Sequence, residues 1–251
     1  MLINIDSSIL ETLSKTEHQI IQFINEHEAD LPNMSIVDIA FETFSSPSTV
    51  SRAIRKCGIN GFNELRYKLT VPNNNKELVN INEIMNKSLI EATEVLQRIS
   101  LSNILSVVNE IQAAKNSRIY IFSRGLTEQA ATEFSLKLQL LGYDVLATGD
   151  PDIIIKLSKR FKKDQLVIIL SLNGQTKELV EASKNAYLNG AKILVICCSE
   201  GSPLFQYASC QLLGYCHEKI EIQDFEVTSR VPLFIISRII VDYLVKQSYG
   251  F

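Results

Sequence analysis

Three short apolar runs in the second half of the chain constrain the fold most. They read IYIF at Ile119–Phe122, QLVIIL at Gln165–Leu170 and KILVIC at Lys192–Cys197. Hydroxyl or glycine residues follow the first two runs and lead into segments with helical spacing, and Ser202-Pro203 follows the third. Continuous apolar runs of this length are typical of strands that are buried on both faces, and their alternation with helices favours a parallel sheet. We therefore predict an α/β domain with a mostly parallel sheet flanked by helices in three layers, α/β/α.

The same reasoning places the remaining elements of this half. Asp150-Pro151 and Ser202-Pro203 each put a capping side chain before a proline, which is typical of the first position of a helix. We expect helices over residues 78–99, 101–115 and 177–189, one that ends near Leu141, one after Pro151, a brief one after Pro203 and a long one from about Glu226 to Lys246, with further strands over 142–146 and 211–213.

The first part of the chain contains only short helical segments. Ser14 to Glu17 forms a capping box that opens a helix with an apolar stripe. A short helix follows Ser35, another covers residues 47–56, and a fourth begins after Gly61. The segment Val71–Lys76 (VPNNNK) favours a linker, because proline ends helices and asparagine tolerates turns. We predict an all-α helix-turn-helix domain over 1–72, a linker over 73–80 and the α/β domain over 81–251.

The segment 47–56 has two chemically different faces. Val50, Ala53, Ile54 and Cys57 recur at helical spacing and are expected to face the domain core. Hydroxyl and basic side chains fall on the opposite face. Together with the helix over 35–42 and the tight turn between them, this is the spacing of a helix-turn-helix, in which the second helix enters the major groove of DNA.

The charge of one segment supports DNA binding, although the first 72 residues as a whole are acidic. Residues 1–72 carry six Lys and Arg against nine Asp and Glu, but 47–70 carry five basic residues against one acid, Glu64. Only nearby charges act strongly on phosphate in salt, so the local patch matters. The alternative is a solvated basic face on a structural helix bundle. The predicted DNA-contacting residues are Ser46, Ser48, Thr49, Ser51, Arg52, Arg55 and Lys56.

Two loops in the α/β domain predict an anion site. SRGLT follows the strand at 118–122, and SLNGQT follows the strand at 165–170. Hydroxyl groups, a glycine turn and a helix N-terminus together can hold phosphate, and the carboxyl ends of parallel strands meet at one edge. The alternative is a pair of ordinary strand-to-helix turns. The predicted ligand-binding residues are Ser123, Arg124, Gly125, Thr127, Ser171, Asn173, Gly174, Gln175 and Thr176.

Several functional classes are disfavoured. The chain has neither GxxxxGK[ST] nor GxGxxG, so neither a P-loop nor a dinucleotide fingerprint is present. Its five cysteines form no CxxC motif, and we interpret them as buried reduced thiols rather than as a zinc site or a disulfide framework. We predict no cofactor, no metal site and no catalytic residues. With no spanning apolar run and no secretory signal, we expect a cytoplasmic protein that does not enter a membrane.

Both parts of the chain resemble the domains of a known protein family. SIVDIA followed by SPSTVSRAIRKCGINGFNELR is similar to the helix-turn-helix domain of the RpiR family of bacterial transcription regulators, and residues 118–213 resemble its sugar isomerase (SIS) domain. The resemblance implies a regulator of sugar or sugar-phosphate metabolism genes that binds a double-stranded DNA operator. It also implies a phosphosugar effector in the SIS domain, and a homodimer or homotetramer.

The chain departs from the family pattern at a few positions. Asn173 stands where the family usually has a second serine, Ser123 where it has glycine, and Thr127 where it has serine. Phe44 and Ser45 stand where a glycine and an aliphatic residue are usual in the turn. We expect Phe44 to supply the missing core contact.

Two alternative functions stay open. A phosphosugar isomerase would need a general base near the substrate carbon, and the candidates after the last short strand are His217, Glu218, Glu221 and Glu226. Acids at the start of a helix are also expected for electrostatic reasons alone. The other alternative is a regulator whose SIS domain binds no ligand and serves only for dimerisation.

Overall fold

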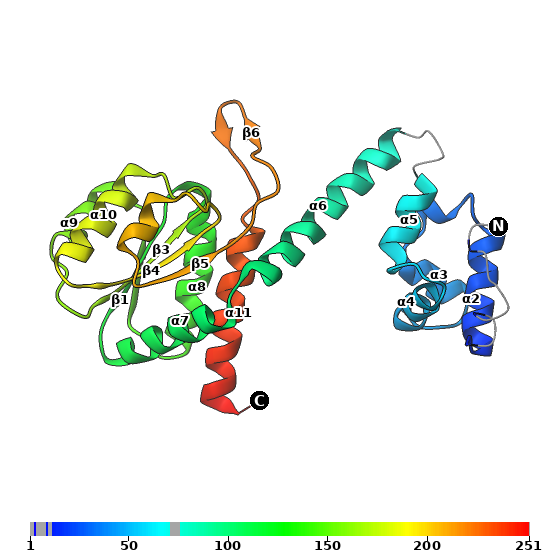
Figure 1. The fold of residues 1–251 in the computed structure, drawn as a ribbon, viewed down its shortest axis with the longest axis horizontal. Coiled ribbons are helices and arrows are strands. Elements are labelled where there is room, and N and C mark those ends of the chain that lie inside the picture. The colour runs from blue at the N-terminus through cyan, green and yellow to red at the C-terminus, as the bar shows by residue number, and fades with distance from the viewer. Residues whose placement is uncertain (1–2, 4–8, 10–11, 71–75, 251) are drawn as a thin grey trace. The chain divides into compact units, whose positions relative to one another are not determined.

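The computed structural model of this protein describes residues 3, 9, 12–70 and 76–250 (Figure 1). The chain forms two compact units, Met1–Lys87 and Ser88–Phe251, whose boundary lies within helix α6 (Lys76–Arg98). The linker predicted around residues 71–75 lies outside the described residues. The domain boundaries at residues 72 and 81 therefore stay predictions.

The first unit is helical, as predicted. Its helices are α2 (Lys15–Glu26), α3 (Ile36–Glu42), α4 (Pro47–Lys56) and α5 (Phe62–Thr70), with a 3-10 turn η1 at Leu31–Asn33. The capping box at Ser14 is confirmed: its Oγ accepts from the Glu17 N–H, and Glu17 accepts from the Ser14 N–H. Ser35 and Asp38 form a second box that opens α3. The core is built from fully buried aliphatic side chains, among them Ile20, Ile24, Ile39, Val50, Ile54 and Leu65.

The expectation that Phe44 would pack in this core is wrong. Phe44 has a φ of +47° and its side chain is 98% exposed. The turn between α3 and α4 is instead closed by polar contacts: the Ser45 N–H donates to the Ala40 carbonyl at 2.8 Å, and the hydroxyl groups of Thr43 and Ser45 are 3.0 Å apart. Phe44 therefore occupies a glycine-type backbone conformation without a packing contact that offsets the strain.

We expect Phe44→Gly to stabilise the first unit by about 1 kcal/mol, because the left-handed conformation costs a bulky residue about that much. Scanning calorimetry of the full chain should show the corresponding rise of roughly 4–8 °C for a unit of this size. Phe41→Gly is the matched control: Phe41 is also exposed but lies inside α3, so glycine there should destabilise. A lower transition temperature for Phe44→Gly would mean that its side chain makes stabilising contacts.

The second unit contains a five-stranded parallel sheet with the order β2-β1-β3-β4-β5 (Figure 1). This confirms the predicted fold class. The strands are β1 (Ile119–Phe122), β2 (Val145–Thr148), β3 (Leu166–Ser171), β4 (Lys192–Cys197) and β5 (Cys210–Leu213). The helices are α7 (Leu101–Ala113), α8 (Glu128–Leu140), α9 (Pro151–Ser158), α10 (Lys177–Leu188) and α11 (Val231–Tyr249), with 3-10 turns at Ala114–Asn116 (η2), Gly125–Thr127 (η3) and Pro203–Tyr207 (η4).

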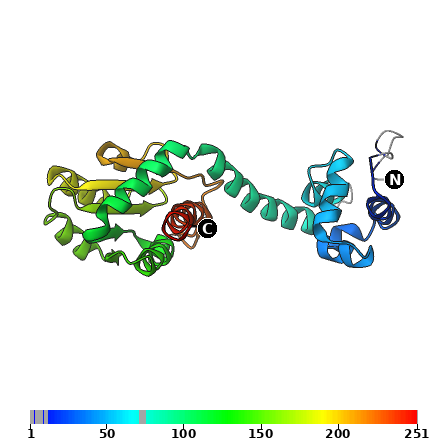
Figure 2. The same cartoon turned by 90° about the horizontal axis from the view of Figure 1, so that it is seen from below.

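Alternate strand residues fill two separate cores, one on each face of the sheet. Helices lie on both sides of the sheet (Figure 2). Ile121, Ile168 and Leu194 pack with residues of α7, α8 and α11. Phe122, Val167 and Ile193 pack with residues of α9, α10 and η4. The strand order reverses between β1 and β3, and in open α/β sheets the crevice at such a reversal is where ligands bind. The two predicted loops, which follow β1 and β3, therefore lie at the edge of the sheet where a ligand is most expected.

Most predicted boundaries lie within two residues of the observed ones, and two differ by more. The strand predicted at 142–146 runs from Val145 to Thr148. The last helix begins at Val231, not near Glu226, because Pro232 occupies its first turn, and Glu226 lies in a small hairpin formed by β6 (Glu221–Ile222) and β7 (Phe225–Glu226). Gln223 and Asp224 both have positive φ and form its turn. Because Gln-Asp is not a common sequence for such a turn, the hairpin was not predicted.

Across the described residues, the helices are too short or too polar to cross a lipid bilayer.

Candidate functional sites

The polar face of α4 carries most of the predicted DNA-contacting residues. Ser46 caps the helix, and its Oγ lies 2.8 Å from both the Ser48 and the Thr49 hydroxyl oxygens. Arg52 extends beyond this cluster and donates to the Thr49 hydroxyl at 3.4 Å. Val50, Ala53 and Ile54 on the opposite face are buried, so core packing fixes which side of α4 faces outward. The first two turns of α4 therefore present hydroxyls and the exposed Arg52 on one surface.

Ser51 and Arg55 lie one turn apart beside the start of α5. A Cβ on Gly61, which has a φ of +115°, would lie 4.0 Å from both the Arg55 Nε and the Ser51 Oγ. These are ordinary van der Waals distances, so the positive φ, and not lack of space, is what favours glycine at this position. Arg52 and Arg55 are both exposed.

Lys56 differs from the two arginines because it is tied to its own unit. Its Nζ lies 2.7 Å from Glu17 Oε2 and donates to the Thr12 carbonyl at 2.9 Å. Glu17 is only 5% exposed. The hydrogen bonds from Lys56 and from the Ser14 N–H hold the pKa of Glu17 below its usual value. Lys56 thus joins the C-terminal end of α4 to the N-terminal end of α2.

We expect this contact to make the first unit sensitive to acid. A carboxyl whose pKa is lower in the folded chain contributes stability above its unfolded pKa, and this contribution is lost as the pH falls through the folded value. Urea unfolding of Glu17→Gln should therefore depend less on pH than unfolding of the wild type between neutral pH and about pH 3. The exposed Glu42 offers the control Glu42→Gln, and an equal pH dependence of all three proteins would contradict the assignment.

The two predicted ligand loops leave the sheet from neighbouring strands. Phe122 at the end of β1 pairs with Ile169 of β3, so Ser123 and Ser171 follow at the same edge. Ser123 and Thr127 are almost fully buried in the loop that leads to α8. Arg124 donates to the Gly149 carbonyl at 2.6 Å, which joins this loop to the end of β2.

Gly174 shapes the second loop. It has a φ of +66°, and its N–H donates to the Ser171 Oγ at 3.0 Å. A Cβ there would lie 1.9 Å from the Ser202 Oγ, so only glycine fits. Thr176 then caps α10 by its backbone position, but within the described part of the chain its hydroxyl makes no capping hydrogen bond. The N-terminal N–H groups of α10 and this hydroxyl therefore point to an anion-binding edge.

A cavity of about 420 Å³ opens beside this loop. Of the predicted ligand residues, Asn173 and Gln175 line it, and the other seven do not: Ser123, Arg124, Gly125, Thr127, Ser171, Gly174 and Thr176. His217 and Glu218, the candidate bases, lie on the cavity wall, whereas Glu221 and Glu226 do not. The sequence interpretation missed the remaining wall residues, which are Leu172, Cys198, Cys216, Lys219 and Thr228.

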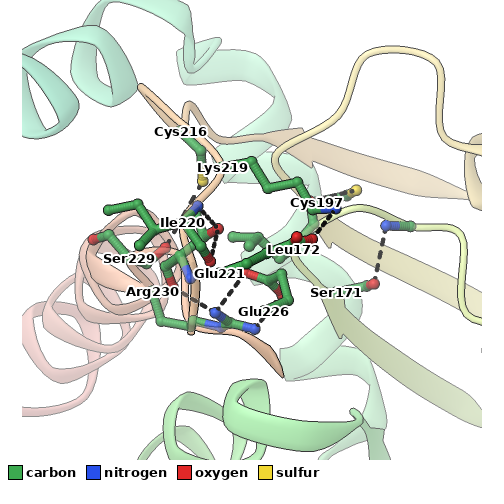
Figure 3. A network of polar contacts seen from close by, with 12 residues as sticks. Ser171, Leu172, Cys197, Cys216, Lys219, Ile220, Glu221, Glu226, Ser229 and Arg230 are labelled. Carbon is green, nitrogen blue, oxygen red and sulfur yellow. Dashed lines mark hydrogen bonds and ion pairs between the residues drawn. The ribbon is translucent and has the colours of Figure 1, made fainter. Parts of the chain in front are cut away.

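Glu226 is held in an ion pair close to this wall (Figure 3). The Arg230 Nη1 and Nη2 atoms lie 3.0 and 2.7 Å from its two carboxylate oxygens. Burial raises the pKa of Glu226, but hydrogen bonds from Thr228 and Arg230 outweigh burial and leave the pKa below its usual value. An ionised carboxylate paired in this way holds the segment before α11 in place, and it is a weak candidate for a general base.

Two family models match the chain, each over one part of it. The model for the helix-turn-helix domain of the rpiR family matches residues 1–76, and the SIS domain model matches residues 112–234. An uncharacterized HTH-type transcriptional regulator of Clostridium perfringens is 22% identical over 250 residues, which are 94% of this chain and 89% of that protein.

Solved structures share the fold. The NanR protein of Vibrio vulnificus, complexed with ManNAc-6P, superposes with a TM-score of 0.57 at 19% identity, over 96% of this chain and 89% of that one. A putative sugar-phosphate isomerase of Listeria monocytogenes superposes with a TM-score of 0.59 at 14% identity, over 69% of this chain and 92% of that one.

Proposed function

Because this chain belongs to the RpiR family of helix-turn-helix transcriptional regulators, we propose that α4 binds operator DNA and that a phosphosugar bound at the β1–β3 edge controls this binding. The genes under control would be those of sugar or sugar-phosphate metabolism. The observation that carries the proposal is the combination, in one chain, of an exposed basic helix in the first unit and, in the second, a sheet edge where the N-terminus of α10 follows a loop rich in hydroxyl groups. Either feature alone occurs in many proteins.

DNA binding would use the exposed face of α4. Arg52 and Arg55 would contact base edges or phosphates in the major groove, and Ser46, Ser48, Thr49 and Ser51 would contact the backbone. Lys56, which is tied to Glu17, would act mainly by holding α4 in place. A homodimer or homotetramer would present two such helices to a two-fold operator.

The effector would bind where the loops after β1 and β3 meet. Its phosphate would lie against the N-terminus of α10, within reach of the Ser171 and Thr176 hydroxyls. Its sugar would extend into the cavity lined by Asn173, Gln175 and His217. The complex of V. vulnificus NanR with ManNAc-6P supports a ligand of this class. The effector would then favour one of two arrangements of the DNA-binding helices, in a protein of the cytoplasm.

A thermal-shift panel of phosphosugars tests the effector site. A true effector present at about a hundred times its Kd should stabilise the second unit by about 2.7 kcal/mol. Thr176→Val should reduce this stabilisation because it removes one hydroxyl, while DNA affinity without the sugar should stay unchanged. If no phosphosugar stabilises the protein, the result would favour the alternative in which the SIS domain serves only for dimerisation.

An isomerase is the alternative function. His217 and Glu218 line the same cavity as Asn173, which is the placement that an enolisation base would need. The fold likeness to the putative isomerase of L. monocytogenes is compatible with this alternative. Incubation with aldose and ketose phosphates distinguishes the two functions: interconversion of any pair would favour the enzyme, whereas stabilisation without turnover would favour the regulator.

A further inference from the structure

Two of the five cysteines meet at the wall of the cavity. Cys198 follows β4 directly, and Cys216 lies three residues after the end of β5. A Cβ on Gly214 would lie 2.7 Å from the Cys198 Sγ, so the missing side chain of Gly214 gives this sulfur room beside the chain that leaves β5. Cys198 and Cys216 both line the cavity and are both partly exposed.

The Gly214 N–H donates to the Cys197 carbonyl at 2.8 Å, so the segment that carries Cys216 leaves β5 directly beside the end of β4 and Cys198. The neighbouring thiol lowers the pKa of Cys216 and raises that of Cys198. Burial opposes the lowering at Cys216, as do the charges of Glu91 and Glu226, whereas the Arg230 guanidinium assists it. Cys216 Sγ also lies 3.8 Å from the Ser229 carbonyl (Figure 3). Cys216 is thus the thiol that ionises more readily, and Cys198 lies on the same cavity wall.

The other three cysteines lack this arrangement. Cys197 is fully buried on the opposite face of the sheet, where its thiol faces the Leu172 carbonyl at 3.5 Å. Cys57 is in the first unit and Cys210 is inside β5. Burial raises the pKa of all three thiols.

We propose that Cys198 and Cys216 form a reversible disulfide in the cavity wall by exchange with a low-molecular-weight disulfide such as oxidised glutathione. The Cys216 thiolate attacks one sulfur of the small disulfide and expels the other as a thiolate, which leaves a mixed disulfide on Cys216. Cys198 then loses its proton, attacks the Cys216 Sγ and expels the second small thiolate. Two electrons pass from the protein to the small disulfide, which becomes two thiols.

The surrounding chain can accept the bond. Disulfide formation needs the two sulfurs to approach to about 2.05 Å, closer than hydrogen-bond contact. Residues 214–216 lie between the end of β5 and the β6–β7 hairpin and belong to no helix or strand, so closing the bond need not break a helix or a strand. The bond would connect the end of β4 to the segment that carries His217, Glu218 and Lys219. On the proposed function, oxidation would therefore change the response to the phosphosugar.

The experiment treats the full chain with oxidised glutathione and counts free thiols by alkylation after denaturation. All five cysteines, each of which the structure describes, are free thiols. One disulfide should therefore leave three thiols, and the mass of the monomer should fall by that of two hydrogen atoms. Peptide mapping should find Cys198 joined to Cys216, and thioredoxin or dithiothreitol should restore five thiols. Five remaining thiols, or a bond between any other pair, would overturn the proposal.

Single variants assign the roles. Cys198→Ser should stop at a glutathione adduct on Cys216, and Cys216→Ser should form neither the adduct nor the bond. Cys197→Ser is the matched control, because it alters the residue next to Cys198 and should still form the disulfide between Cys198 and Cys216. Failure of this variant to form that disulfide would contradict the assignment of Cys198 and Cys216 as the reactive pair. Thermal shifts with the phosphosugar panel, before and after oxidation, test the link to the effector. If the disulfide forms but no phosphosugar stabilises either redox state, the proposed effector site is contradicted and the disulfide is not. If a phosphosugar stabilises the reduced and the oxidised protein equally, the proposed coupling between the disulfide and the effector is contradicted.

Discussion

The double variant Arg52→Ala/Arg55→Ala should lose specific binding to the promoter fragment of its own gene. Each arginine is exposed on the outward face of α4, and a bidentate contact from arginine to a base is worth about 1–3 kcal/mol. Removing two such contacts should weaken binding roughly 30-fold to 10⁴-fold. Fluorescence anisotropy with the labelled fragment measures the change.

The salt dependence of binding gives a second readout of the same change. If each protomer of a dimer neutralises three or four phosphates, wild-type affinity should fall by roughly a thousandfold between about 50 and 200 mM salt, and the double variant should show a shallower slope. Lys15→Ala is the control, because it removes an exposed cation from the start of α2 instead of α4. Unchanged affinity in a double variant that keeps its helical circular dichroism would show that α4 is not the recognition helix.

The sequence predicted the elements whose signals are local. Capping residues mark the starts of α2, α3, α4 and α9, and the structure shows these caps as hydrogen bonds. β3 and β4 were predicted because they are buried on both faces and so read as continuous apolar runs. These signals depend on a few neighbouring residues only.

The wrong or missing predictions concern positions set by distant contacts or by strain. Phe44 was expected in the core because Phe44 and Ser45 replace the glycine and the aliphatic residue usual in the family's turn, but the polar turn around Ser45 leaves Phe44 outside. The far wall of the cavity, from Cys216 to Thr228, has no periodic pattern, and it meets Asn173 only because β5 lies two strands from β3 in the sheet. Parallel strand geometry predicted the SLNGQT edge, and His217 and Glu218 were named as candidate bases, but the sequence held no signal that Cys216, Lys219 and Thr228 lie opposite that edge.

Gly174→Ala should abolish phosphosugar binding and destabilise the second unit. The new Cβ would lie 1.9 Å from the Ser202 Oγ and 2.9 Å from the Cys197 Sγ, and φ at this position is +66°. Left-handed strain costs about 1–2 kcal/mol, and forcing an extra carbon into a packed site costs about 1–3 kcal/mol more. The loop must then move away from the N-terminus of α10. We therefore expect the stabilisation by an effector, about 2.7 kcal/mol in the wild type, to disappear.

Thermal unfolding with and without the phosphosugar panel measures both effects. Gly201→Ala is the control, because a Cβ there would meet nothing within 4 Å in the described structure, and this variant should unfold like the wild type. Ser202→Gly removes the nearest clashing atoms, so combining it with Gly174→Ala should restore part of the lost stability. The backbone strain and the Cys197 contact would remain, and the hydrogen bonds of the Ser202 hydroxyl with the Leu204 N–H and the Gly174 carbonyl would be lost. Full sugar-dependent stabilisation in the Gly174→Ala single variant would place the effector away from the SLNGQT loop, because no ligand held by that loop could tolerate its displacement.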